Sequence, residues 1–199
     1  NGCFSDVTVT LTPTDCSTTS VNVLGMTKAV STATFVNNNA YNVTYTVVAT
    51  NASTVDLTNF SIIDNLNNTF PLPTTYSIIS APVVTSLNSS LTTNSSFDGS
   101  IQNDMLSPLT STLSAGRRDT IVFTVQINPN GFFGPFNNSA IGSGFDGITT
   151  VADSSNTGFA WDPDNDGDPT NNDIPTVLNL IPNTQIGVAK SGSVSAILA

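Results

Sequence analysis

The sequence predicts an all-β fold, a β-sandwich with flanking strands or linkers. Apolar and polar residues alternate with a period of two in several short runs, which is the pattern of strands with one buried face. Turn-forming Gly, Pro, Asn and Ser separate these runs, and no stretch of about eleven residues supports an amphipathic helix. A chain of 199 residues can bury one substantial core, so one main domain is expected.

Two long alternating runs define the expected central strands. In residues 41–48 the apolar face consists of Tyr41, Val43, Tyr45 and Val47. The apolar face of the second run consists of Ile121, Phe123, Val125 and Ile127. Shorter strands are expected at residues 57–63, 76–84, 136–141, 148–152 and 176–180.

A six-residue pattern that occurs twice in the sequence suggests where the main domain begins and ends. Residues 24–29 (LGMTKA) and 186–191 (IGVAKS) share an aliphatic-Gly-aliphatic-small-Lys-small pattern about 160 residues apart, which favours tandem duplication of a whole domain. The alternative is a chance likeness of two strands. We expect residues 1–20 to end a preceding domain or to form an exchanged strand or linker. Residues 21–183 would form the sandwich, and residues 184–199 would begin the next repeat or a linker.

Composition narrows the possible functions. Charged residues make up 9% of the chain, Glu and His are absent, and the net charge is -10, which argues against nucleic acid and anionic membranes as partners. The basic residues are Lys28, Arg117, Arg118 and Lys190. Since the commonest general bases and zinc ligands are missing, no enzymatic activity is expected. A cation or a neutral polymer is a better partner for this surface.

The two cysteines favour an oxidising compartment, which is consistent with the expected extracellular location at the cell surface. No apolar run reaches the roughly 18 residues of a membrane span, and the first residues lack the pattern of a signal peptide, so an excised fragment is expected. A disulfide between Cys3 and Cys16 would close a loop of about 14 residues and contribute roughly 3 kcal/mol. This pair favours an oxidising compartment; two buried thiols are the alternative.

An acidic run at residues 161–175 (WDPDNDGDPTNNDIP) predicts a calcium site. Its carboxylates are Asp162, Asp164, Asp166, Asp168 and Asp173. The first three occupy positions 1, 3 and 5 of a calcium loop, Gly167 occupies position 6, and the last occupies position 12. Hard oxygen ligands suit Ca²⁺ better than zinc or copper. The nearby prolines and the lack of helical periodicity indicate a loop between strands, and a solvated acidic turn is the alternative.

In residues 22–182 the sequence resembles the DUF11-type immunoglobulin-like repeat of large bacterial and archaeal cell-surface adhesins and filaments. The matching stretches are LGMTKA, YNVTYTVVATN, LTNFSIIDNL, LSAGRRDTIVFTV, GPFNNSA and DPDNDGDPTNND. The resemblance implies an immunoglobulin-like sandwich at the cell surface with a structural or adhesive role, and it implies no catalytic site.

Two classes of function follow from these observations. The first is a structural repeat module of an extended adhesin or filament, stiffened by calcium, whose partners are neighbouring copies of the same domain or subunit. The second is an adhesive module that binds carbohydrate or a host protein. Assembly by donor-strand exchange also stays open, because the segment that contains the cysteines lies outside the resemblance.

Three further features bear on these functions. Seven glycosylation sequons occur, at Asn42, Asn51, Asn59, Asn67, Asn88, Asn94 and Asn137, and in a bacterial protein they are expected to be bare. Phe132, Phe133 and Phe136 lie in one loop, which we expect to plug the end of the sandwich; an exposed contact patch is the alternative. Trp161 is expected to pack under the acidic loop.

Lys28 is the only lysine in the expected main domain and lies on its first strand. Asn137 and Asn138 lie on a late strand, and Asp64 ends another. Some surface immunoglobulin-like domains join such Lys and Asn side chains covalently with the help of a buried carboxyl group. An exposed lysine is the interpretation that the sequence favours.

Overall fold

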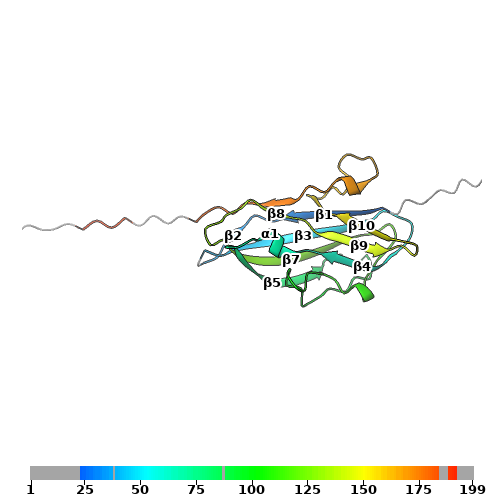
Figure 1. Ribbon diagram of the computed structural model, residues 1–199, viewed down its shortest axis with the longest axis horizontal. Helices are drawn as coiled ribbons and strands as arrows, with labels where there is room; N and C mark the ends of the chain where they lie inside the picture. Colours follow the sequence, from blue (N-terminus) through cyan, green and yellow to red (C-terminus); the bar gives the residue numbers. More distant parts are fainter. Residues whose placement is uncertain (1–22, 38, 87, 184–187, 192–199) are drawn as a thin grey trace, which may run out of the picture.

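The computed structural model describes residues 23–37, 39–86, 88–183 and 188–191, which contain two sheets packed as a sandwich. The first sheet has the strand order β11-β1-β3-β7-β5, and β2 pairs with β3. The second has the order β10-β9-β4-β6, and β12 pairs with β8 beside the sandwich (Figure 1). The strands of the first sheet are β1 (Leu24–Val30), β2 (Thr34–Phe35), β3 (Tyr41–Asn51), β5 (Thr75–Val84), β7 (Arg118–Asn128) and β11 (Asn156–Thr157). The other strands are β4 (Leu57–Ile63), β6 (Thr112–Leu113), β8 (Phe136–Asn138), β9 (Ile141–Phe145), β10 (Thr150–Ser154) and β12 (Thr176–Leu178).

The central strands β3 and β7 contribute one side of the hydrophobic core. They pair antiparallel over ten positions, and every second residue of each is buried. Tyr45 lies opposite Phe123, and their rings stack with centroids 5.4 Å apart. The facing sheet contributes the buried apolar side chains Leu57, Phe60 and Ile62 of β4. This interlocking of two alternating faces is the arrangement of a β-sandwich.

Strand β1 is buried on both faces, which distinguishes it from the alternating strands. Its first five residues are all buried. Met26 points into the sandwich, where a Cβ added at Gly142 of β9 would collide with it. On the opposite face a Cβ added at Gly25 would lie 2.6 Å from Trp161 Cε3, so glycine is required for the indole to pack there. The segment that follows β11 therefore covers the outer face of β1.

The chain changes sheets between β10 and β11. Strand β10 pairs antiparallel with β9 in the second sheet, whereas β11 pairs parallel with β1 in the first. Ser155 lies between them; it donates its backbone N–H to Ala140 O at 2.8 Å, and its Oγ accepts from Ala140 N at 2.9 Å. These two bonds fasten the crossing segment to the residues that precede β9.

The start of β1 and the segment after β12 lie at opposite ends of the sandwich. Strand β1 begins with Leu24 paired to Asn51, the last residue of β3. After β12, Tyr41 at the start of β3 donates its hydroxyl to Ile181 O at 2.7 Å and accepts from Asn183 N at 3.1 Å. Because β3 runs from residue 41 to residue 51, these two points are about 33 Å apart along the strand. Figure 1 shows the start of β1 and the end of the segment after β12 at opposite ends of the long axis.

The predicted all-β sandwich is confirmed. Helix is confined to short turns among the described residues: α1 (Leu66–Thr69) and the 3-10 turns η1 (Pro108–Thr110) and η2 (Pro169–Asn171). The run expected as one strand at residues 136–141 is divided into β8 and β9, which pair with different strands. In the part of the chain that the structure describes, no helix is long and apolar enough to cross a membrane. The expected limits at residues 20 and 184 fall on or beside residues outside the described ranges.

Candidate functional site

The Lys28 side chain lies inside the sandwich. It extends from β1 and is 0% exposed, with Nζ 4.9 Å from the ring centroid of Tyr45 and 5.8 Å from that of Phe123. The expectation of an exposed lysine is therefore wrong. The reason is the period of two, which places Lys28 on the same face of β1 as Leu24 and Met26, both buried. An ammonium group in such an apolar place requires a partner.

That partner is Asp64, which follows β4 in the facing sheet. Its Oδ2 forms an ion pair with Lys28 Nζ, and both side chains are 0% exposed. The backbone N–H of Asp64 donates to Asn103 O at 2.9 Å, which fixes the position of the carboxylate. The ion pair thus joins the two sheets across the core, and period two again places Asp64 on the face of Phe60 and Ile62.

Asn138 completes the buried cluster from β8. It is 1% exposed, whereas its neighbour Asn137 points to solvent. Asn138 pairs across strands with Thr176 of β12, and the hydroxyl of Thr176 donates to Lys28 O at 2.7 Å. These contacts hold β8 beside β1, and they bring the Asn138 amide against the buried pair.

The Asn138 amide is close to its neighbours but is not hydrogen-bonded to them. It lowers the pKa of both Asp64 and Tyr45 through side-chain interactions. Yet neither Nδ2 nor Oδ1 of Asn138 has a partner in normal hydrogen-bond geometry among the described residues. The same is true of Asp64 Oδ1 and Tyr45 Oη. Each buried polar atom without a partner costs about 1–3 kcal/mol, so four of them in one cluster require an explanation.

Burial shifts the pKa values of this cluster toward the neutral forms of its groups. Burial lowers the pKa of Lys28, and the adjacent Asp64 carboxylate opposes this only in part. Burial likewise raises the pKa of Asp64, against the opposing effects of Lys28 and Asn138. Burial, together with the charge of Asp64, also raises the pKa of Tyr45, which keeps its phenol protonated. An amine, a carboxylic acid and an amide in contact form a set of reactive groups as well as a structural one.

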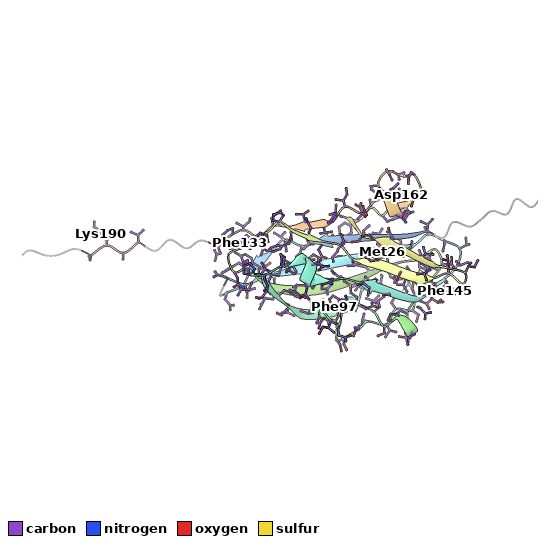
Figure 2. The ribbon with its side chains drawn as sticks, in the orientation of Figure 1. Met26, Phe97, Phe133, Phe145, Asp162 and Lys190 are labelled. Atoms are coloured by element: carbon purple, nitrogen blue, oxygen red, sulfur yellow. The ribbon has the colours of Figure 1, made fainter. Side chains whose placement is uncertain are left out.

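The acidic loop is a second candidate site, and it protrudes from the sandwich near β10 (Figure 2). Asp162, Asp164 and Asp166 each offer a carboxylate oxygen within 4.8 Å of the other two. The turn is shaped by Asn165 and Gly167, whose φ angles are 59° and 86°. Gly167 N donates to Asp162 Oδ2 at 3.0 Å. The spacing predicted from the sequence thus does bring the first three carboxylates together.

The other two predicted calcium ligands lie elsewhere. Asp168 caps η2 by accepting from the N–H of Thr170 at 3.1 Å and from its hydroxyl at 2.6 Å. Asp173 lies beyond η2 and is not a member of the group. Burial raises the pKa of Asp153 on β10, a residue that is 4% exposed, to about 7, and Asp173 and Asp168 contribute to this shift. Asp153 is a buried ionisable group that the sequence did not single out.

The aromatic loop and Trp161 have packing roles. Phe136 is 1% exposed and contacts Phe132 edge to face, at a centroid distance of 5.3 Å. Phe133 packs against Tyr41 at the same end of the sandwich. Phe133 and Phe136 thus pack as the expected plug requires, whereas Phe132 is 38% exposed. Trp161 packs on Gly25 of β1 at the start of the acidic run.

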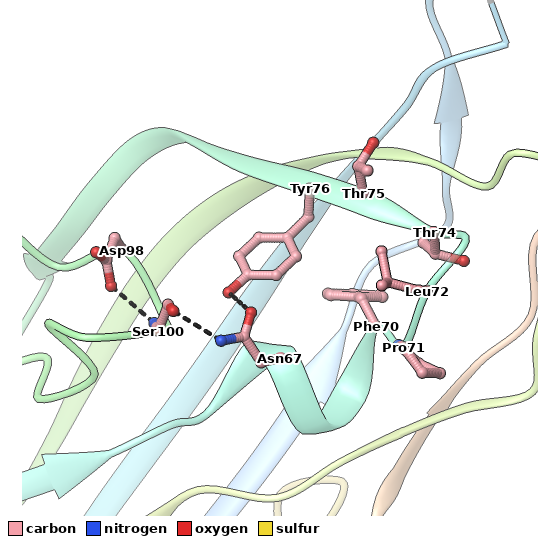
Figure 3. A pocket seen from close by; sticks show the side chains of 9 residues that line it. All are labelled: Asn67, Phe70, Pro71, Leu72, Thr74, Thr75, Tyr76, Asp98 and Ser100. Atoms are coloured by element: carbon pink, nitrogen blue, oxygen red, sulfur yellow. Dashed lines mark hydrogen bonds between the residues drawn. The ribbon is translucent and has the colours of Figure 1, made fainter.

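A surface pocket beside α1 contains polar groups that bind one another (Figure 3). Tyr76 Oη donates to Asn67 Oδ1 at 2.9 Å, and Asn67 Nδ2 donates to Ser100 Oγ at 2.7 Å. Burial raises the pKa of Tyr76 to about 12, with smaller contributions from Asp98 and Asp64, so its hydroxyl stays protonated. No nucleophile in this pocket contacts a base among the residues that the structure describes.

The sequons differ in accessibility. Asn59, Asn67, Asn88 and Asn137 are exposed, and Asn42 and Asn94 are partly buried. Asn51 is 0% exposed, and its amide donates to Val55 O at 2.9 Å and Leu113 O at 3.0 Å. The folded domain therefore presents no acceptor at Asn51, which corrects its inclusion among the candidates. The predicted pair Cys3 and Cys16 lies outside the described residues.

Comparisons with known proteins identify no family. No protein-family model and no curated protein matches the chain. One similar solved structure is the GH20 exo β-N-acetylglucosaminidase from Vibrio harveyi in complex with N-acetylglucosamine, with 14% identity and a TM-score of 0.37 over 84% of this chain and 20% of that one. An inactive mutant of that enzyme gives 13% identity and a TM-score of 0.34 with the same coverage. The chain spans about a fifth of that enzyme's length, and so distant a likeness supports no conclusion about activity.

Proposed function

We propose that this chain is a structural repeat module of an extended cell-surface adhesin or filament. The single observation that carries the proposal is the placement of its ends: β1 begins about 33 Å along β3 from the point where residues 181–183 contact Tyr41. Modules connected in this way add their lengths, so a row of them forms a long shaft. The sequence resemblance to DUF11-type repeats supports the same role.

The strand arrangement suits a load applied between those ends. Strand β1, where one end begins, is hydrogen-bonded to β3 over seven positions and to β11 on its other edge. A pull along the long axis would act on these ladders lengthwise, so many hydrogen bonds would have to break together. The buried contact between Lys28 and Asp64 adds a tie from β1 to the second sheet.

The acidic loop would bind a calcium ion in this proposal. Asp162, Asp164 and Asp166 form a group of hard, anionic oxygen donors, and Oδ1 of Asp162 is buried without a hydrogen-bond partner among the described residues. These three side chains would hold the ion and so stiffen the loop that covers β1. The ion would have a structural role, and the proposal includes no catalytic step.

Electron microscopy of the native surface material tests the proposal. We expect thin fibres with an axial repeat of at least about 33 Å for each module. The same repeat is expected whether the modules share one polypeptide or assemble non-covalently. Mass measurement of the isolated fibres would tell whether successive modules share one polypeptide. Compact, separate particles in native material would contradict the proposal and would favour a module that binds a ligand by itself.

A further inference from the structure

We propose that Lys28 and Asn138 become joined by an intramolecular amide bond, with Asp64 as the catalytic residue. The inference concerns a modification inside the core and does not depend on the proposed function. It rests on three buried side chains that come from three different strands or strand ends: Lys28 from β1, Asp64 after β4, and Asn138 from β8.

The geometry explains why these groups would react. Lys28 Nζ contacts Asp64 directly, and Thr176, the cross-strand partner of Asn138, donates its hydroxyl to Lys28 O at 2.7 Å, which places Asn138 beside this pair. All three side chains are at most 1% exposed, so water does not compete as a nucleophile or as a hydrogen-bond partner. The rings of Tyr45 and Phe123 enclose the amine and limit its motion. Such fixed proximity replaces the entropy that an encounter between free groups would cost.

The reaction needs no external reagent. Lys28 first passes a proton to Asp64, which leaves a neutral amine beside a carboxylic acid; burial lowers the pKa of Lys28 and raises that of Asp64, which makes this transfer less costly than between exposed groups. The amine lone pair attacks Cγ of Asn138 while Asp64 donates its proton to Oδ1. Asp64 then carries a proton from Nζ to Nδ2. As the Cγ–Nδ2 bond breaks and ammonia leaves, the Oδ1 proton returns to Asp64 and the Cγ–Oδ1 double bond forms again. The products are an Nζ–Cγ amide, ammonia and a protonated Asp64.

The bond would also remove one unsatisfied polar atom of the cluster and supply another with a donor. Before the reaction, Asn138 Nδ2 and Oδ1 and Asp64 Oδ1 lack hydrogen-bond partners among the described residues. Afterwards Nδ2 is gone, the buried ammonium is replaced by a neutral amide, and the new N–H can donate to Asp64. A buried ion pair by itself is weak evidence for stability, whereas the same groups are well placed for this chemistry.

The cross-link would be well placed for a load-bearing domain. It would connect the strand at which one end of the domain begins to β8, which pairs with the last described strand, β12. The residues between Lys28 and Asn138 include the whole β3–β7 pair. A pull on the two ends of the chain could not extend this part without breaking a covalent bond.

Intact-mass spectrometry of the reduced, denatured wild-type protein tests the inference. We expect a mass lower than that of the sequence by one ammonia molecule, and the full sequence mass for Lys28→Met, Asp64→Ala and Asn138→Ala. Asn137→Ala, which changes the exposed neighbour on β8, is the matched control and should keep the deficit. A wild-type protein at full mass overturns the inference, whether or not the variants fold.

Tryptic digestion locates the bond. The chain has four basic residues, and Arg117 and Arg118 lie between Lys28 and Asn138 in the sequence. Cleavage at these arginines should leave the two halves of wild type attached under reducing, denaturing conditions, without cleavage after Lys28. In Lys28→Met the halves should separate. Separation of the wild-type halves, or a link to Asn137 in the fragment spectra, would refute the assignment to Asn138.

Discussion

Replacing Asp153 by Asn should reduce the dependence of the unfolding free energy on pH. Asp153 lies on β10, is 4% exposed and accepts from Met26 N at 2.6 Å through Oδ2. Its Oδ1 is buried without a hydrogen-bond partner among the described residues. Burial, aided by Asp173 and Asp168 and opposed by two backbone N–H groups, raises its pKa from 3.8 to about 7. An Asn at this position keeps an oxygen for Met26 N and does not titrate.

The sign and the size of the effect follow from the difference between the two pKa values. Because the folded-state pKa is the higher one, the folded chain holds this proton more tightly than the unfolded chain. The resulting stability is fully present below about pH 4 and is lost as the pH rises through about 7. At about 1.4 kcal/mol for each pKa unit, the loss is on the order of 4 kcal/mol. The variant should not show this loss.

Urea unfolding followed by the fluorescence of Trp161, the single tryptophan, measures the effect. The two proteins are compared from about pH 4 to about pH 8 in the presence of a chelator, since a bound cation would change the field around Asp153. We expect the stability of wild type relative to Asp153→Asn to fall as the pH rises. Parallel curves for the two proteins would refute this account of Asp153.

Three further predictions concern the loop, the cover of β1 and a buried amide. A calcium site with an extracellular-grade Kd of about 10⁻⁴ to 10⁻³ M would stabilise the fold by about 0.4 to 1.4 kcal/mol at millimolar calcium, so a chelator should lower the Tm of wild type by a few degrees. The Tm of the double variant Asp164→Asn, Asp166→Asn should not change with the chelator. An unchanged Tm of wild type would contradict the calcium site. Gly25→Ala should cost about 1–3 kcal/mol in urea unfolding, because its new Cβ would lie 2.6 Å from Trp161 Cε3; an unchanged midpoint would show that the indole is not packed there. Asn51→Ala should cost about 1–3 kcal/mol, since it removes the side-chain donor to the buried Leu113 O and the acceptor of Ser53 N; a smaller loss of unfolding free energy in urea would show that other groups replace the amide.

The central strands could be predicted from the sequence because their environment is simple. One face of β3 and of β7 is packed and the other is half-buried, so burial follows the alternation that the sequence displays. The limits of β4 at Leu57 and Ile63 were also predicted correctly. The break between β8 and β9 could not be predicted, because it depends on Ser155, which approaches Ala140 from a later part of the chain.

The Lys28 cluster was harder to predict because charge and period gave opposite indications. Lysine is seldom fully buried, so its charge indicated an exposed residue. The period of two, however, places Lys28 with Leu24 and Met26, and it places Asp64 with Phe60 and Ile62. The sequence therefore contained a signal for burial of both groups. Their contact depends on the packing of the two sheets, which no local pattern reveals.

The acidic loop shows how far local spacing can predict a site. Asp162, Asp164 and Asp166 converge because a short turn fixes their positions relative to one another. Asp168 fits the acidic pattern equally well, but the 3-10 turn that starts at Pro169 uses its carboxylate as an N-cap. Capping by a residue just outside the turn thus removes one expected ligand from the group.

Single-molecule pulling on the two ends of the chain tests the load-bearing account most directly. Lys28 and Asn138 are 110 positions apart, so a bond between them would withhold about 400 Å of extension, at about 3.6 Å for each residue. Complete unfolding of wild type should therefore release about 400 Å less length than unfolding of Lys28→Met, while Asn137→Ala should behave as wild type. Equal extensions for wild type and Lys28→Met would contradict a covalent bond that prevents the residues between Lys28 and Asn138 from extending under load.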